Sequence, residues 1–171
     1  GLINQVAIHL GASLKEKGLQ SKFISTIHDY PDFTKSYTNS RKTVARVMAA
    51  EGQKMLALFD IHRDSIPGVA EGQKATINGR KAAPILIIVG TNERKTHPHW
   101  RENLDFAQRI YKEGEKLYPG LIKGVRTKSG TYNQEFFNHA LLLEFGTDYN
   151  TVEECFYSGE LFYKFFIFSL L

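Results

Sequence analysis

Two short apolar segments, about eighty residues apart, constrain this chain more than any other feature of its sequence. One covers residues 56–61 and runs into His62, and the other covers residues 140–143 and runs into Glu144. Strands buried on both faces have continuous apolar runs, and ligands of open α/β sheets sit beyond the carboxyl ends of the strands. We therefore expect His62 and Glu144 to share a cleft, where a neutral imidazole binds a metal ion and a carboxylate acts as general base.

Each of these two residues also has a purely structural interpretation. A histidine at a strand end is often only a hydrogen-bonded group, although the neighbouring Asp60, Arg63 and Asp64 make this strand end densely polar. Such a polar group is costly to bury unless it is paired or coordinates a ligand. Glu144 follows three leucines, so burial is expected to raise its pKa, but a salt bridge to Arg63 or Arg41 is an equally good interpretation.

The composition indicates one compact domain over residues 1–171, since 42% of the residues are hydrophobic and the length suits a single core. The net charge of +4 is spread along the chain, which is typical of a solvated surface and also suits polyanionic surroundings such as a cell wall. No nucleic-acid-binding signature is present. The single cysteine, Cys155, excludes an internal disulfide and a cysteine metal cluster.

Hydrophobic periodicity predicts an alternation of helices and strands. The expected helices cover residues 2–17, 40–48, 100–117 and 151–171, the expected strands cover 21–27, 55–61, 84–89, 122–126 and 140–145, and a hairpin covers 75–81. Alternation of this kind favours an α/β three-layer sandwich with a mostly parallel central sheet.

Further polar residues are weaker candidates for a site. His28 ends an expected strand beside Asp29, and a carboxylate often supports an imidazole that lines a metal cleft. Asn133 and Gln134 form a polar group shortly before the strand that ends at Glu144, where they would read a substrate amide or simply form a turn. His97 and His99 flank Pro98 in a polar loop, where a surface role is expected and chelation of a metal ion is the alternative.

Several of these stretches together resemble one known family. They are Ile27-His28-Asp29-Tyr30-Pro31, Ser36-Tyr37-Thr38-Asn39-Ser40-Arg41, Asp60-Ile61-His62-Arg63-Asp64-Ser65, Val89-Gly90-Thr91-Asn92, Trp100-Arg101-Glu102-Asn103-Leu104, Tyr132-Asn133-Gln134, Leu142-Leu143-Glu144-Phe145-Gly146 and Asn150-Thr151-Val152-Glu153-Glu154. In this order they resemble the sporulation stage II protein P family, which is similar to the zinc-dependent N-acetylmuramoyl-L-alanine amidases. The resemblance extends over essentially the whole chain.

The resemblance implies an amidase-like α/β fold and a peptidoglycan hydrolase. The expected reaction cleaves the amide between N-acetylmuramic acid and the L-alanine of the stem peptide, with a second, endopeptidase activity on cross-links. It also implies action during sporulation engulfment, outside the cytoplasm and anchored through an upstream membrane segment. The implied partners are peptidoglycan, a glycan-cleaving protein and a membrane protein of sporulation, and no nucleic acid is expected.

Residue by residue, the resemblance makes His62 a zinc ligand and Glu144 the catalytic glutamate. It places Arg41, Arg63, Asp64, Asn133 and Gln134 around the cleft. The family's first strand, which supplies the other ligands, is expected to be missing here, and catalytic zinc normally has three protein ligands. The chain is therefore interpreted as a fragment or a degenerate copy with little or no activity. The alternative function is a catalytically dead remnant that binds the cell wall or a partner.

Overall fold

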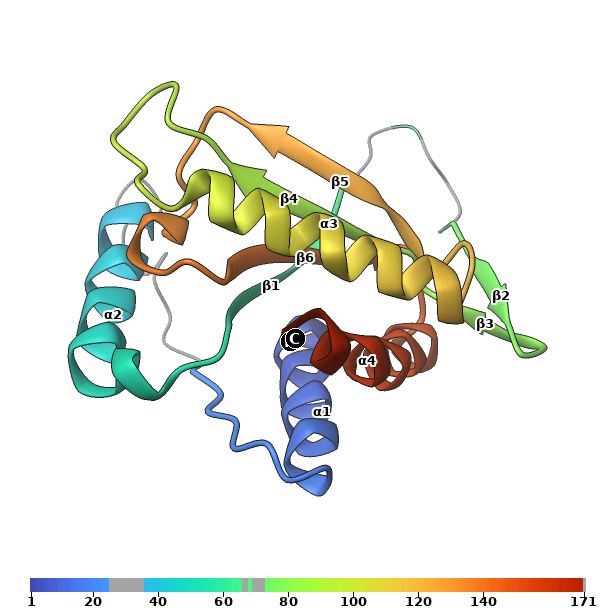
Figure 1. Cartoon of the computed structure of the whole chain (residues 1–171). Helices are drawn as coiled ribbons and strands as arrows, with labels where there is room; N and C mark the ends of the chain where they lie inside the picture. The colour runs from blue at the N-terminus through green and yellow to red at the C-terminus, as the bar shows by residue number, and fades with distance from the viewer. Residues whose placement is uncertain (25–35, 66–67, 69–72, 171) are drawn as a thin grey trace.

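The computed structural model describes residues 1–24, 36–65, 68 and 73–170, and four of its strands form one mixed sheet (Figure 1). The strands lie in the order β1 (Leu58–Asp64), β6 (Ala140–Thr147), β4 (Ile85–Gly90) and β5 (Ile122–Lys128). β1 is parallel to β6 and β5 is parallel to β4, whereas β4 and β6 are antiparallel. The prediction of an α/β fold with a mostly parallel sheet is therefore confirmed.

The antiparallel step in the middle of the sheet was not predicted. It brings the carboxyl ends of β1 and β6 to one end of the sheet and those of β4 and β5 to the other. Because His62 and Glu144 belong to β1 and β6, they come to the same end, as the sequence predicted.

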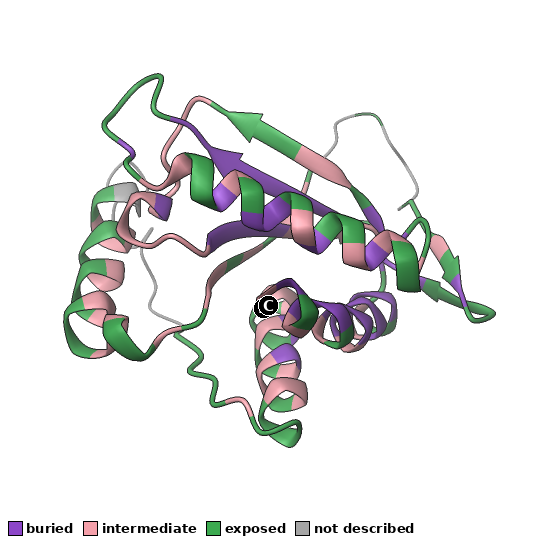
Figure 2. Ribbon diagram, viewed as in Figure 1, coloured by how far each residue is buried: buried purple, intermediate pink, exposed green. Residues whose placement is uncertain are grey.

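The main core lies between one face of the sheet and the helices α1 (Leu2–Glu16), α3 (Trp100–Leu117) and α4 (Val152–Phe166). On α3, the spacing of Phe106, Ala107, Ile110 and Gly114 presents one continuous face to this core. On α4, Thr151 caps the first turn by accepting a hydrogen bond from the backbone N–H of Glu154. Figure 2 shows α4 and the central strands as the most buried parts of the fold.

The other face of the sheet carries a small apolar cluster made by Leu86, Ile88 and Leu142, with Tyr132 packed against it. Helix α2 (Ser36–Glu51) has its main contacts with the 3-10 helices η2 (Gly52–Lys54) and η3 (Gln134–Phe136), at one end of the sheet (Figure 1). The expected sandwich has a helical layer on each face of the sheet. Within the described residues, the broad helical layer is on one face and is formed by α1, α3 and α4.

A short hairpin precedes β4. β2 (Ala75–Ile77) and β3 (Arg80–Ala82) are joined by Asn78 and Gly79, whose φ angles of 51° and 77° fit the predicted tight turn. The phenol of Tyr157 in α4 donates a hydrogen bond to the backbone carbonyl of Ile77. The hairpin is thereby attached to the last helix.

Several predicted boundaries are corrected by the structure. The expected strand over residues 21–27 is irregular through residue 24, where Phe23 and Ile24 are exposed, and its remainder lies outside the described residues. A strand needs a partner, and these residues have none among the described strands. The last helix ends at Phe166 and continues as the 3-10 helix η4 (Ile167–Leu170). No helix in the described part of the chain is long and apolar enough to cross a membrane.

The aromatic packing around Phe162 predicts a large effect on stability. Phe162 is fully buried and contacts the rings of Phe59, Phe145 and Phe166. We expect Phe162→Ala to lower the free energy of unfolding by about 3–5 kcal/mol, because it removes apolar contacts and leaves a cavity. Urea denaturation measures the loss. The matched control, Phe168→Ala, replaces a ring that is 55% exposed and should change stability by less than about 0.5 kcal/mol; equal losses would contradict the packing.

Candidate active site

His62 and Glu144 are direct register partners on the parallel strands β1 and β6. Partners in such a pair point to the same face of the sheet, so the imidazole and the carboxylate lie side by side on the face opposite the main core. The sequence predicted that these two residues share a cleft, and the strand register brings them together.

His62 is half exposed, and its Nε2 atom lies 2.9 Å from Oδ1 of Asp60. Asp60 precedes it by two residues and therefore lies on the same face of β1. The hydrogen bond to Asp60 raises the pKa of His62, the charges of Asp60 and Glu144 act in the same direction, and burial opposes them. The imidazole is thus accessible and electrostatically coupled to Glu144.

Glu144 is partly buried at the end of an otherwise buried strand segment. Burial is the main reason that the pKa of Glu144 is raised, and the negative charge of Asp64 raises it further. The positive charges of Lys128, His62 and Arg126 act against this shift. A carboxylate with a raised pKa is a better proton acceptor, as a general base requires.

The salt bridges considered from sequence are made elsewhere. The Arg63 guanidinium donates hydrogen bonds to the backbone carbonyls of Thr147, at 2.8 Å, and Asn150, at 3.5 Å. Arg41 pairs with Glu135 and lies over the ring of Phe136. Neither arginine forms an ion pair with Glu144 in the part of the chain that the structure describes. The structural interpretation of Glu144 as a salt-bridge partner of Arg63 or Arg41 is therefore wrong.

A shallow depression of about 20 Å³ lies beside Glu144, with enough room for roughly one water molecule. The residues that line it come from five separate parts of the chain. They are Asp64, Gln73, Pro84, Leu86, Lys123, Glu144, Gly146 and Thr147. Asp64, which was predicted near the cleft, lines this depression together with Glu144.

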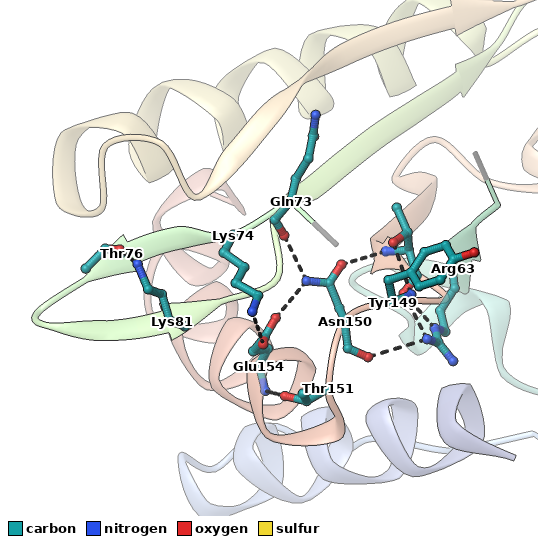
Figure 3. Close-up of polar contacts among 10 residues, drawn as sticks. Arg63, Gln73, Lys74, Thr76, Lys81, Tyr149, Asn150, Thr151 and Glu154 are labelled. Atoms are coloured by element: carbon teal, nitrogen blue, oxygen red, sulfur yellow. Dashed lines mark hydrogen bonds and ion pairs between the residues drawn. The ribbon is translucent and has the colours of Figure 1, made fainter. Parts of the chain in front are cut away.

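The end of β6 is held by a polar network centred on Asn150 (Figure 3). The Asn150 side chain accepts a hydrogen bond from the backbone N–H of Thr147, and its amide nitrogen donates to the Gln73 carbonyl and the Glu154 carboxylate. Glu154 also pairs with Lys74 at 3.5 Å. These contacts join β6, α4 and the segment before β2, and they fix the strand just after Glu144.

An irregularity in the pairing of β1 and β6 lies within the same network. His62 is opposite Glu144 but Asp64 is opposite Thr147, so β6 contains one extra residue at this point. Gly146 lies in the irregular segment with φ +62°, and a Cβ atom there would come within 2.3 Å of Asn150 Oδ1. Glycine is therefore required for both the backbone conformation and the close approach.

Arg41, Asn133 and Gln134 are not brought to this site. The Asn133 side chain donates to the Ser40 hydroxyl, and the Gln134 side chain donates to the Ile88 carbonyl and accepts from the Gly90 N–H. Gly90 is at the carboxyl end of β4, which is the opposite end of the sheet from the end of β6. In this structure these residues connect η3 to α2 and β4. His28 lies outside the described residues.

The sequence interpretation of His97 as a surface residue is wrong, since only 2% of this residue is exposed. Burial lowers its pKa, against the effect of the Glu135 charge. The sequence offered little indication that His97 is buried, because a polar loop between two elements usually lies on the surface.

The donor set is chemically suitable for zinc but incomplete. His62 offers an accessible imidazole beside two carboxylates, which is a typical environment for a catalytic zinc ligand. Among the described residues, however, no three histidine, cysteine, aspartate or glutamate side chains come together as a metal site.

Sequence reasoning looked for site residues at the carboxyl ends of strands. It therefore missed other residues that lie around Glu144. Gln73, Asn150 and Lys123 lie in the depression or in the network that supports it. The Lys123, Arg126 and Lys128 pattern in one short strand was a usable signal for a basic edge.

Comparison with known proteins gives similarity in both sequence and fold. A model of the stage II sporulation protein P family matches residues 2–167. The stage II sporulation protein P of Bacillus subtilis (strain 168) is 35% identical over 150 residues, which are 85% of this chain and 35% of that protein. The structure of the CwlD amidase from Clostridioides difficile, in complex with the GerS lipoprotein, matches with a TM-score of 0.58 at 9% identity, covering 96% of this chain and 83% of that one.

The tight packing at Gly146 can be tested against a glycine in open space. We expect Gly146→Ala to destabilise the fold by about 2–4 kcal/mol, from backbone strain plus overlap with Asn150. The control Gly120→Ala also has a positive φ, of +88°, but nothing lies within 4 Å, so only about 1–2 kcal/mol of strain is expected. Urea denaturation of both variants measures the difference, and equal effects would argue against the close approach.

The environment of Glu144 predicts a pH-dependent effect on stability. Since the pKa of Glu144 is raised on folding, the folded chain holds this proton more tightly, and stability is lost as pH rises from the unfolded value toward the folded one. Glu144→Gln should therefore gain stability relative to wild type as the pH rises above about 4.5, the ordinary pKa of this carboxyl. Denaturation in the presence of a chelator measures this gain, and Glu153→Gln, an exposed control, should show none.

Proposed function

Because the chain belongs to the stage II sporulation protein P family, we propose that it is a peptidoglycan hydrolase of the amidase kind that acts in sporulation. The fold similarity to the CwlD amidase supports this class of enzyme. The chain spans about a third of the length of the curated relative that it matches. The proposal therefore concerns the activity of this domain within such a protein.

The proposed reaction is hydrolysis of the amide between N-acetylmuramic acid and L-alanine. The observation that carries it is the register pairing of His62 with Glu144 on one face of the sheet. Glu144, with its raised pKa, takes a proton from the attacking water and returns it to the nitrogen of the leaving amine. Asp64 sustains the proton affinity of this carboxylate by its nearby charge.

His62 is the proposed zinc ligand of the described chain. When bound, zinc would lower the pKa of the attacking water and polarise the scissile carbonyl. Asp60 contacts the His62 ring at 2.9 Å and would orient it, as carboxylates do for metal-binding histidines. The additional ligands are proposed to come from residues outside the described part.

The wider setting is also part of the proposal. It includes endopeptidase activity on cross-links, a role in engulfment, an extracytoplasmic position anchored through an upstream segment, and glycan-cleaving and membrane partner proteins. The family membership supports the sporulation setting. The CwlD amidase forms a complex with the GerS lipoprotein, which supports a search for protein partners of this chain.

A catalytically dead remnant that binds the cell wall or a partner remains the second candidate. The observation that favours it is the lack of a three-residue metal cluster among the described residues. The two candidates make opposite predictions for metal content.

Zinc content and hydrolysis, measured together on this chain and on a version extended upstream, test the proposal. We expect Glu144→Gln to keep zinc but lose at least about 100-fold in amide hydrolysis, because it removes the general base. His62→Ala should lose both zinc and activity. The controls Glu153→Gln and His99→Ala should lose neither. If neither length binds zinc or cleaves peptidoglycan, the remnant is the correct description.

A further inference from the structure

We propose that Lys123, Arg126 and Lys128 of β5 form a binding site for the carboxylates of the stem peptide. We name these three side chains the β5 cation row. The proposal rests on the proposed hydrolase function, because it assigns the row to the substrate whose amide would be cleaved beside Glu144.

The register of the sheet places the row on the face that carries Glu144. On β5, Arg126 is the partner of Ile88 and Gly124 is the partner of Leu86, which is itself opposite Glu144. Partners share a face, so Gly124, Arg126 and Lys128 follow one another on the face of Glu144. Lys123 lies at the irregularity between β4 and β5 and lines the depression together with Glu144.

The three side chains are available to a ligand. All three are exposed, and within the described residues none forms an ion pair. In contrast, Lys22, Lys74, Arg109 and Lys116 are each paired with a carboxylate. Neither β4 nor β5 contains an acidic residue, so their strands supply no internal partner for the row.

The charges of the row reach the proposed catalytic group. The positive charges of Lys128 and Arg126 both act to lower the pKa of Glu144. A negatively charged ligand bound to the row would be attracted by these positive charges. It would also weaken their lowering of the Glu144 pKa. The row is therefore part of the same electrostatic environment as Glu144.

The spacing suits a peptide. β5 lies two strands from β6, which is roughly 10 Å. An extended peptide of three or four residues spans about 10–14 Å. With its scissile amide at Glu144 and its chain crossing Leu86 toward Lys123, a stem peptide would bring its carboxylates to the row. Exposed lysine and arginine side chains bind such carboxylates through charge-assisted hydrogen bonds.

A pair of substrates tests this assignment. One is a muropeptide with free stem-peptide carboxylates, and the other is the same compound with those carboxylates amidated. We expect the upstream-extended wild-type chain to show a KM about ten-fold lower for the free acid, equivalent to about 1.4 kcal/mol, with similar kcat. The triple variant Lys123→Gln, Arg126→Gln, Lys128→Gln should lose this preference, so that its KM is the same for the free acid and for the amidated substrate.

The control removes the same charge elsewhere. Lys95→Gln, Lys112→Gln, Lys116→Gln replaces three exposed cations outside β5 and should keep the full preference. The proposal is overturned if wild type does not discriminate between the substrates, or if both triple variants lose the preference equally. It is also overturned if a poly(glycerol phosphate) polymer binds the row and the peptide does not.

A binding measurement separates this proposal from the hydrolase function. Fluorescence anisotropy of a labelled stem peptide on Glu144→Gln protein requires no turnover. Weaker binding of the amidated peptide, and weaker binding by the β5 triple variant, would support the row even if no hydrolysis is found. Equal binding in both comparisons would overturn the row while leaving the hydrolase proposal intact.

Discussion

The register between β1 and β6 is the constraint on which the rest of the site depends. A shift of one residue would turn every side chain of a strand to the opposite face, and His62 would no longer lie beside Glu144. Leu141 and Leu143 of β6 oppose such a shift, because they are buried in the main core and the shift would turn Glu144 into it. The hydrogen bonds from Arg63 to the end of β6 fix the same register from the polar side.

Electrostatics divides the arginines and carboxylates around this pair into two groups. Arg63 donates hydrogen bonds to backbone carbonyls and Arg41 forms an ion pair with Glu135. Neither arginine therefore neutralises Glu144. Asp60 and Asp64 instead lie close to His62 and Glu144 and raise the pKa of each. The two carboxylates beside His62, those of Asp60 and Glu144, favour a cation at this imidazole, which agrees chemically with the proposed metal site.

Sequence reasoning succeeded where the signal was local and failed where it depended on packing. The apolar runs before His62 and Glu144 predicted two strands and their common end, and Asn78-Gly79 predicted the hairpin. The same reasoning placed Gln134 near Glu144, but its amide satisfies buried backbone groups of β4. The direction of β4 relative to β6 could not be predicted, because strand pairing is decided by contacts distant in sequence. The burial of His97 could not be predicted either, because it also depends on packing between segments that are distant in sequence.

The antiparallel contact between β4 and β6 has an evolutionary consequence. The proposed catalytic pair lies near the carboxyl ends of β1 and β6. In contrast, Pro84 directly precedes β4 and Lys123 lies at the start of β5. The proposed chemistry and the proposed recognition therefore belong to separate stretches of the chain. On this proposal, substitutions near Pro84 and at the start of β5 would alter ligand preference while the register of His62 and Glu144 is inherited unchanged.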